Sequence, residues 1–142
     1  MRTGMISAED RERLRQEAQA ASARAYCPYS AFRVGAAILT GEGAVVSGCN
    51  VENASYGLTI CAERNAIFRA IASADRDAPL RIVAVAIHTP TPTPTAPCGA
   101  CRQVINEFGP EAEVYSFCEG PEVLQSTLAE LLPHAFGPSN LE

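Results

Sequence analysis

The positions of apolar side chains predict where the first helix lies. Four apolar residues recur at helical spacing near the start of the chain: Leu14, Ala18, Ala21 and Ala25. This spacing places them on one face of a helix, which can then be buried. Ser7 precedes that face and Asp10 follows three residues later, a short variant of the capping box that starts helices. We therefore expect a helix over residues 7–25, which Pro28 breaks.

Four stretches have the composition of β-strands. Residues 32–39 and 44–48 are joined by the sequence GEG at 41–43, which predicts a hairpin. Residues 81–89 are almost continuously apolar, as expected for a strand whose two faces are both covered. Residues 113–117 have the same character. The chain therefore contains one predicted hairpin and two further strands.

Three more helices are predicted after the hairpin. Residues 61–72 carry apolar side chains at helical spacing, and the sequence PCGACRQVINEF at 97–108 is typical of a turn that enters a helix. Residues 127–132 predict a short last helix, because Thr127 and Glu130 have the spacing of a capping box. Helices and strands alternate over most of the chain, which predicts an α/β sandwich with a mixed sheet in one domain, residues 1–142.

Composition and charge narrow the function. Apolar residues make up 47% and charged residues 19% of the 142 residues, as in a compact soluble protein. Neither a transmembrane segment nor a secretion signal is recognisable, so we expect a cytoplasmic protein that binds no membrane. The net charge of -5 argues against binding to nucleic acid, where lysine and arginine on phosphates supply much of the affinity. In a cytoplasmic chain, the six cysteines favour metal binding or catalysis over disulfides.

Three cysteines have the spacing of a metal site. Cys98 and Cys101 form a C-x-x-C pair at a predicted helix start, where two sulfurs can converge on one metal ion. Such a pair can also be a redox couple or half of a structural zinc site. Cys61 stands at another predicted helix start and can supply a third ligand. A catalytic zinc site has three protein ligands and leaves the fourth position open, so a catalytic site becomes the favoured interpretation.

Two charged residues, Glu63 and Arg64, follow Cys61 closely in the sequence. Glu63 would lie beside the open position of such a site without being a ligand. Three thiolates make zinc electron-rich and therefore a poorer Lewis acid. Helix N-termini beside the cysteines can offset this charge, and Arg64 can donate hydrogen bonds to the sulfurs. The alternative for Arg64 is a solvated surface arginine.

These motifs together resemble one enzyme family. A zinc site with a C-A-E element, a non-ligand glutamate and a P-C-x-x-C element is typical of zinc deaminases. The chain resembles the small, homotetrameric cytidine deaminases whose zinc ligands are all cysteines. The resemblance runs nearly end to end, through AYCPYSAFRVGAA, GCNVENASYG, CAERNAIF, PCGACRQVI and LLPHAFGP. It implies a three-layer α/β/α sandwich with a mixed five-stranded sheet.

The resemblance also implies a reaction and a catalytic set. Zn²⁺, one per subunit, would be held by Cys61, Cys98 and Cys101. Glu63 would take a proton from the water on zinc, pass it to N3 of the pyrimidine and later protonate the leaving amine. Cytidine and 2'-deoxycytidine would be hydrolysed to uridine and 2'-deoxyuridine with release of ammonia, as in pyrimidine salvage.

The resemblance assigns further residues to substrate binding. Asn50 and Glu52 match residues that hydrogen-bond the ribose, and Phe32 matches an aromatic residue that packs on the pyrimidine. The backbones of Ala54 and Ala62 would also line the pocket. Without the resemblance, Asn50 and Glu52 would be expected in a simple turn and Phe32 in the core.

Two aromatic residues are implied to act across a subunit boundary. Tyr56 and Phe136 match residues that the family delivers into a neighbouring subunit's site. The resemblance therefore implies a homotetramer with composite active sites. Taken alone, a phenylalanine near the C-terminus would be expected to pack against the core or the tail.

Several alternatives stay open at the level of sequence. Cys27, Cys49 and Cys118 have no part in the family pattern, and we expect small buried hydrophobic side chains rather than a fourth ligand. A deaminase of the same fold could act on a modified cytosine nucleoside instead. A nucleic-acid-editing deaminase is disfavoured by the acidic charge and by a cysteine at position 61. A structural zinc module or a thiol redox protein is the alternative from another class.

Overall fold

A mixed five-stranded sheet forms the centre of the protein. The computed structural model describes residues 6–75 and 77–142. The strand order is β2-β1-β3-β4-β5. The strands are β1 (Gly35–Thr40), β2 (Val45–Cys49), β3 (Ile82–His88), β4 (Glu113–Phe117) and β5 (Leu124–Thr127). The predicted α/β sandwich with a mixed five-stranded sheet is confirmed.

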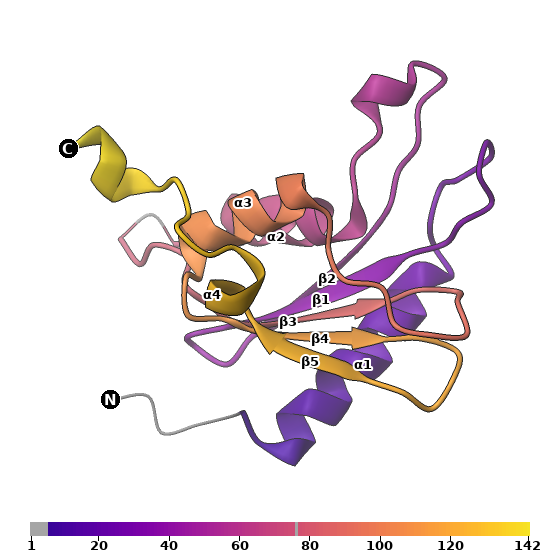
Figure 1. Ribbon diagram of the computed structural model, residues 1–142, viewed down its shortest axis with the longest axis horizontal. Helices are drawn as coiled ribbons and strands as arrows, with labels where there is room; N and C mark the ends of the chain where they lie inside the picture. The colour runs from indigo at the N-terminus through magenta and orange to yellow at the C-terminus, as the bar shows by residue number, and fades with distance from the viewer. Residues whose placement is uncertain (1–5, 76) are drawn as a thin grey trace.

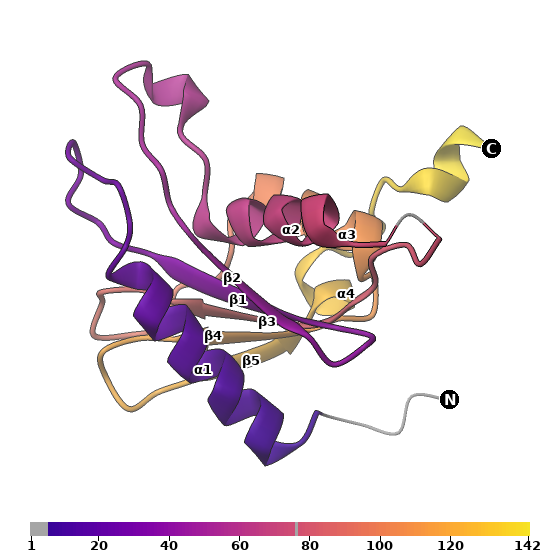
Figure 2. The same cartoon turned by 180° about the vertical axis from the view of Figure 1, so that it is seen from behind.

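Helices cover both faces of this sheet, which gives three layers (Figures 1 and 2). The helix α1 lies on one face, whereas α2, α3 and α4 lie on the other. The helices are α1 (Ala8–Ser22), α2 (Ala62–Ser73), α3 (Gly99–Phe108) and α4 (Leu128–Leu131), with short 3-10 turns η1 (Tyr56–Leu58) and η2 (Pro138–Leu141). Each face of β3 is therefore buried, which explains its nearly continuous apolar sequence.

The strand directions follow from the connections. The hairpin β1–β2 is antiparallel, and β1 is also antiparallel to β3, so β2 and β3 point the same way. The helix α2 connects these two strands, and α3 connects β3 to its parallel neighbour β4. Crossover helices between parallel strands place the carboxyl ends of those strands at one edge of the sheet.

The observed boundaries correct four predictions. The first helix ends at Ser22 and not at residue 25, and the first strand begins at Gly35 and not at residue 32. No strand was assigned to residues 124–127, although they form β5 and pair antiparallel with β4. Its side chains are exposed or half-buried, so the alternation that marks a strand is weak there. The last helix is only Leu128–Leu131, but its capping box from Thr127 to Glu130 is confirmed.

Two hydrophobic clusters hold the layers together. One lies between the sheet and α2, α3 and α4 and includes Ile67, Ile87 and Ile105. The other lies between the sheet and α1 and includes Leu14 and Tyr115. Because the strands beside α2 and α3 are fixed by this packing, the first turns of both helices have defined positions.

Candidate active site

Two helix starts bring the three cysteines together. Cys61 is the N-cap of α2 and Cys98 is the N-cap of α3, while Cys101 lies in the first turn of α3. The Sγ atoms of all three lie within 4.8 Å of one another, and those of Cys61 and Cys98 are 3.8 Å apart. Bonds of about 2.3 Å from zinc to sulfur at tetrahedral angles imply sulfur separations of about 3.8 Å. The cluster therefore fits one tetrahedral zinc ion.

The environment of the cysteines favours a thiolate at Cys61. Hydrogen bonds from the Cys101 thiol, and then from Arg64 and Cys98, lower the pKa of Cys61 to about 5 although partial burial opposes this. The pKa of Cys101 is raised, because its thiol donates to Cys61 and because it is buried. One thiolate is thus formed in advance for a metal ion, and a metal displaces the remaining protons.

Arg64 lies in contact with Cys61. Its Nη2 atom donates to Cys61 Sγ at 3.5 Å, and this contact raises the pKa of the guanidinium. Its Nε atom is buried and has no hydrogen-bond partner among the described residues. The side chain is half-buried rather than solvated, so the surface-arginine alternative is wrong.

Glu63 is a buried carboxyl group beside this cluster. It lies in the first turn of α2, and its residue is only 5% exposed. Burial is the main reason why the pKa of Glu63 is raised, and the charge on Cys61 acts in the same direction. A carboxyl group with a raised pKa can hold and release a proton closer to neutral pH than an exposed one can.

A cavity of about 240 Å³ opens onto these groups. Its lining includes six of the residues proposed from the sequence, namely Phe32, Asn50, Cys61, Ala62, Glu63 and Cys98. Cys101 is fully buried behind them. Ile87 and Thr89 bring the carboxyl end of β3 to the same cavity, as expected for an α/β sheet.

Four of the proposed substrate-binding residues do not line this cavity. Glu52, Ala54 and Tyr56 lie on the segment between β2 and α2, which projects from the body of the protein beside the segment before β1 (Figure 1). Phe136 lies between α4 and η2, in the C-terminal segment. Tyr56 is 74% exposed and Phe136 is 60% exposed. Within one chain these residues therefore do not join the zinc cluster.

Hydrogen bonds hold the backbone segments around Asn50 and Glu52 in place. The side chain of Asn50 accepts from the Val34 N–H at 2.9 Å and donates to the Phe32 carbonyl at 2.8 Å, which fixes the segment that carries the Phe32 ring. The Glu52 carboxylate accepts from the hydroxyl of Ser30 and from the backbone N–H of Tyr29 at 3.0 Å. These bonds lower the pKa of Glu52, so it stays ionised.

Sequence reasoning missed three threonines that line the cavity: Thr59, Thr89 and Thr95. Two of them lie in the threonine–proline segment 89–97, next to the C-x-x-C motif. Its proximity to that motif was the available signal. The alternating prolines predict only an extended segment there and indicate no role for its hydroxyl groups.

The other cysteines stay outside the metal cluster. Cys27 is buried as expected, whereas Cys49 and Cys118 are half-buried. All six cysteines are free thiols, and the only described group able to hold a metal through three ligands is Cys61, Cys98 and Cys101. Nothing in the described structure therefore closes the site with a fourth cysteine.

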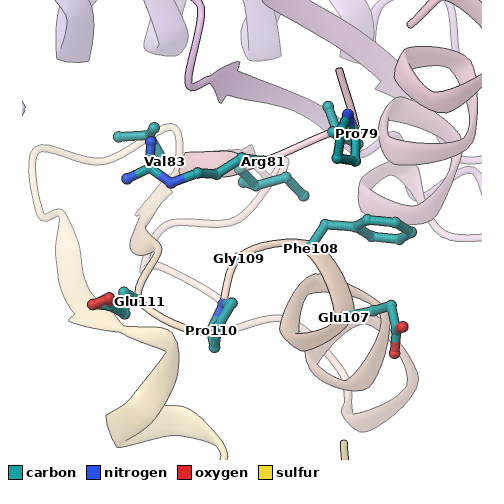
Figure 3. A pocket seen from close by; sticks show the side chains of 10 residues that line it. Pro79, Arg81, Val83, Glu107, Phe108, Gly109, Pro110 and Glu111 are labelled. Carbon is teal, nitrogen blue, oxygen red and sulfur yellow. The ribbon is translucent and has the colours of Figure 1, made fainter. Parts of the chain in front are cut away.

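A larger cavity lies at the opposite end of β3. It has a volume of about 780 Å³ and lies between the start of β3 and the end of α3 (Figure 3), beside Arg81, Phe108 and Glu111. The described residues that line it include no cysteine or histidine. Of these two cavities, only the small one is lined by thiols and a buried carboxyl group, so it is the candidate active site.

Comparisons with known protein families, sequences and structures identify the family of this chain. The family model described as "Cytidine and deoxycytidylate deaminase zinc-binding region" matches residues 8–117. The chain belongs to the cytidine deaminase family. A cytidine deaminase of Halalkalibacterium halodurans is 48% identical over 128 residues, covering 89% of this chain and 94% of its own. The crystal structure of a Burkholderia pseudomallei cytidine deaminase has a TM-score of 0.82 and 46% identity, covering 92% of this chain and 100% of its own.

A second structure extends the likeness. The cytidine deaminase of Mycobacterium tuberculosis has a TM-score of 0.72 and 42% identity, covering 90% of this chain and 98% of its own. As a member of the cytidine deaminase family, the protein is a zinc-dependent enzyme, and the cysteine cluster accounts for its zinc. Membership in this family favours a deaminase over the structural zinc module and the redox protein.

Proposed function

We propose that this protein deaminates cytidine and 2'-deoxycytidine by hydrolysis, yielding uridine and 2'-deoxyuridine with ammonia, as in pyrimidine salvage. The observation that carries this proposal is the buried Glu63 carboxyl group beside the three-thiol cluster, at a cavity that also exposes the Phe32 ring. A cavity of about 240 Å³ has room for a pyrimidine ring.

Cys61, Cys98 and Cys101 would hold the zinc ion. When bound, zinc supplies a Lewis acid that lets water ionise near neutral pH. Glu63 then carries two protons in turn: its carboxylate accepts the first from the attacking water and delivers it to ring atom N3, and it then accepts the second from the hydroxyl group added to the ring and delivers it to the leaving amine. A raised pKa helps one group to serve as base and then as acid, and burial raises the pKa of Glu63.

The chain's own groups would orient the nucleoside. Phe32 packs against the pyrimidine, and Asn50 holds the Phe32 segment in place. The Ala62 N–H lies in the first turn of α2, where backbone donors lack partners within the helix, so it can donate to a pyrimidine oxygen. The backbone of Ala54 would complete the pocket.

Glu52 would recognise the ribose together with Asn50. Its carboxylate is ionised and held by Ser30, and it can accept a hydrogen bond from a ribose hydroxyl. The same negative charge repels a phosphate. We therefore propose a free nucleoside, and neither a nucleotide nor a nucleic acid, as the substrate.

Tyr56 and Phe136 would complete the site of a neighbouring subunit in a homotetramer. Their exposure in one chain supports this proposal, because solvent-exposed aromatic rings are expected at subunit interfaces. We further propose that residues 1–142 form one deaminase domain that works in the cytoplasm, where its free thiols stay reduced.

The direct test is an assay of the purified protein with five compounds, paired with zinc quantification. Cytidine and deoxycytidine should be turned over, and CMP, cytosine and adenosine should not, with about one zinc ion per chain as a single three-cysteine cluster implies. Turnover of CMP at the same rate would contradict the role given to Glu52. A zinc-loaded protein that ignores all five compounds would point to a modified cytosine nucleoside.

A further inference from the structure

The helix α3 connects the zinc site to the C-terminal segment. Its first residues carry Cys98 and Cys101, and its next turns carry two side-chain amides. Gln103 Nε2 donates to the carbonyl oxygen of Phe136 at 2.5 Å, and Asn106 Nδ2 donates to the same oxygen at 3.3 Å. The two amides are three residues apart and therefore share one face of the helix.

The backbone after Phe136 lies directly against this face. A Cβ atom on Gly137 would be 3.2 Å from Asn106 Nδ2. The Gly137 N–H donates to Asn140 Oδ1 at 2.8 Å, which closes a turn behind Phe136. The backbone at Phe136 is thus held by the two amides and by the turn that follows it, while the ring itself remains largely exposed.

Arg102 ties the same helix to two further backbone carbonyls. Its Nε atom donates to the Pro97 carbonyl at 2.7 Å, immediately before Cys98. Its Nη1 atom donates to the Leu131 carbonyl at 2.8 Å, at the end of α4. The loop that leads into the zinc ligands and the segment that leads to Phe136 are therefore both fixed on α3.

We propose that Gln103 and Asn106 are positioning residues that hold Phe136 where its ring can enter the active site of a neighbouring subunit. This inference rests on the proposed composite active site. The Phe136 carbonyl belongs to an exposed residue, so water can replace the amides as its donor. The two amides therefore restrict the direction of the segment rather than satisfy a buried acceptor, and their loss affects substrate binding more than folding.

The test compares kinetics of full-length enzymes that carry Q103A together with N106A, with and without F136A. Without the amides, KM for cytidine should rise roughly three- to tenfold, the effect of losing one or two ordinary hydrogen bonds that fix a binding group. The value of kcat and the zinc content should not change. In the F136A background, removing the amides should have no further effect on KM.

Two single substitutions and a control sharpen the comparison. Gln103→Lys keeps an N–H donor at similar length and should retain a KM close to wild type. Gln103→Glu keeps the shape but removes the donor and should raise KM. Gln16→Ala removes an exposed amide from α1, on the other face of the sheet, and should change nothing.

Each other outcome overturns the inference in a recognisable way. Loss of zinc in the Q103A and N106A enzyme would show that the amides support α3 itself. An equal rise in KM in the F136A background would show that they act independently of Phe136. If F136A raises KM but removal of the amides does not, the composite site stands and the positioning role fails. If F136A has wild-type kinetics, both the proposed role of Phe136 in a composite site and this inference are contradicted.

Discussion

At the scale of single residues, Glu63 is an ionisable side chain in a buried position. Its carboxyl group is buried in the folded protein, and the nearby Cys61 sulfur adds unfavourable charge. Burial of an ionised group is unfavourable unless partners compensate for it. The position is therefore better explained by proton transfer than by stability.

Replacing Glu63 with glutamine separates these two roles. Glu63→Gln keeps the shape but cannot carry a proton, so turnover should fall by at least about a thousandfold, near the upper range for a general acid–base group. Zinc should remain at wild-type occupancy, and the melting temperature should be equal or higher because a buried charge is gone. The measurements are steady-state kinetics, metal content and thermal unfolding. Near-wild-type turnover would contradict the assignment.

Arg64 is predicted to tune the metal rather than to hold it. Arg64→Ala removes the donor to Cys61 Sγ, which leaves more charge on that sulfur and a weaker Lewis acid. We expect zinc to remain bound and kcat to fall roughly ten- to hundredfold, the range seen when outer partners of metal ligands are lost. Arg69 on the same helix donates to the Ser47 carbonyl and serves as the control, since Arg69→Ala should leave kcat unchanged.

At the scale of elements, two glycines set how closely helices approach the sheet. A Cβ atom on Gly48 in β2 would meet the backbone of Ala66 and lie 2.9 Å from the Ala62 carbonyl, both in α2. A Cβ atom on Gly35 in β1 would meet the backbone of Ala18 and lie 2.5 Å from the Ser22 nitrogen, at α1. Backbone cannot yield as a flexible side chain does, so each helix would have to move.

The two glycines should differ in their effect on activity. Gly48→Ala and Gly35→Ala should each destabilise the protein by about 1–3 kcal/mol, the range for overpacking. Only Gly48→Ala displaces α2, which carries Cys61 and Glu63, so it should also lower kcat. Denaturant unfolding and kinetics of both variants test this, and equal loss of kcat in both would contradict it.

The strand β3 carries a buried histidine that should make stability depend on pH. His88 is 7% exposed, and its pKa is lowered, first by burial and then by Arg15, while Glu119 opposes this. In the unfolded chain the imidazole regains a pKa of about 6.5. Below that pH the unfolded state binds a proton that the folded state does not. The free energy of unfolding therefore falls as pH falls from about 6.5 through the folded pKa.

Substitution of His88 should weaken this dependence. Denaturant unfolding at about pH 7.5 and about pH 5.5, on either side of the ordinary histidine pKa, should show a smaller difference for His88→Gln than for wild type. Protonation of the zinc ligands acts equally on both proteins and cancels in the comparison. His134→Asn, at an exposed position, is the control. An unchanged pH dependence in His88→Gln would contradict the prediction.

At the scale of the whole molecule, one chain contains the cysteine cluster and Glu63. It also exposes two aromatic rings, those of Tyr56 and Phe136, that do not line the cavity beside these groups. Tyr56 packs edge-to-face on Tyr29, with ring centroids 5.8 Å apart, and this contact joins the segment before β1 to the segment between β2 and α2. Phe136 lies on the C-terminal segment. In the proposed composite active site, another subunit would cover these two rings.

Mixing two defective variants tests the composite site. Chains with Glu63→Gln keep a normal Phe136, and chains with Phe136→Ala keep a normal Glu63. When both are co-expressed, some sites combine the intact residue from each chain. Activity above that of either variant alone is expected in a composite tetramer, with the mass checked by analytical ultracentrifugation. Activity no higher than the sum of the two separate enzymes would contradict shared sites.

The sequence by itself determined the reactive groups and the helices and strands other than β5. Helical spacing around Leu14, the apolar run of β3 and the C-x-x-C motif depend on neighbours along the chain, so local patterns suffice to predict them. The N-cap positions of Cys61 and Cys98 followed from the same patterns and are confirmed. Resemblance to a family then supplied the strand count and the reaction.

Only the tertiary structure decided the geometry in which these groups meet. The distance between Cys61 and Cys98, the burial of Glu63 and the contact of Arg64 with sulfur arise because α2 and α3 start at the same edge of the sheet. The hydrogen bonds from Gln103 and Asn106 to the Phe136 carbonyl join residues 30 or more positions apart. Packing across such separations depends on the whole fold, and local sequence carries no record of it.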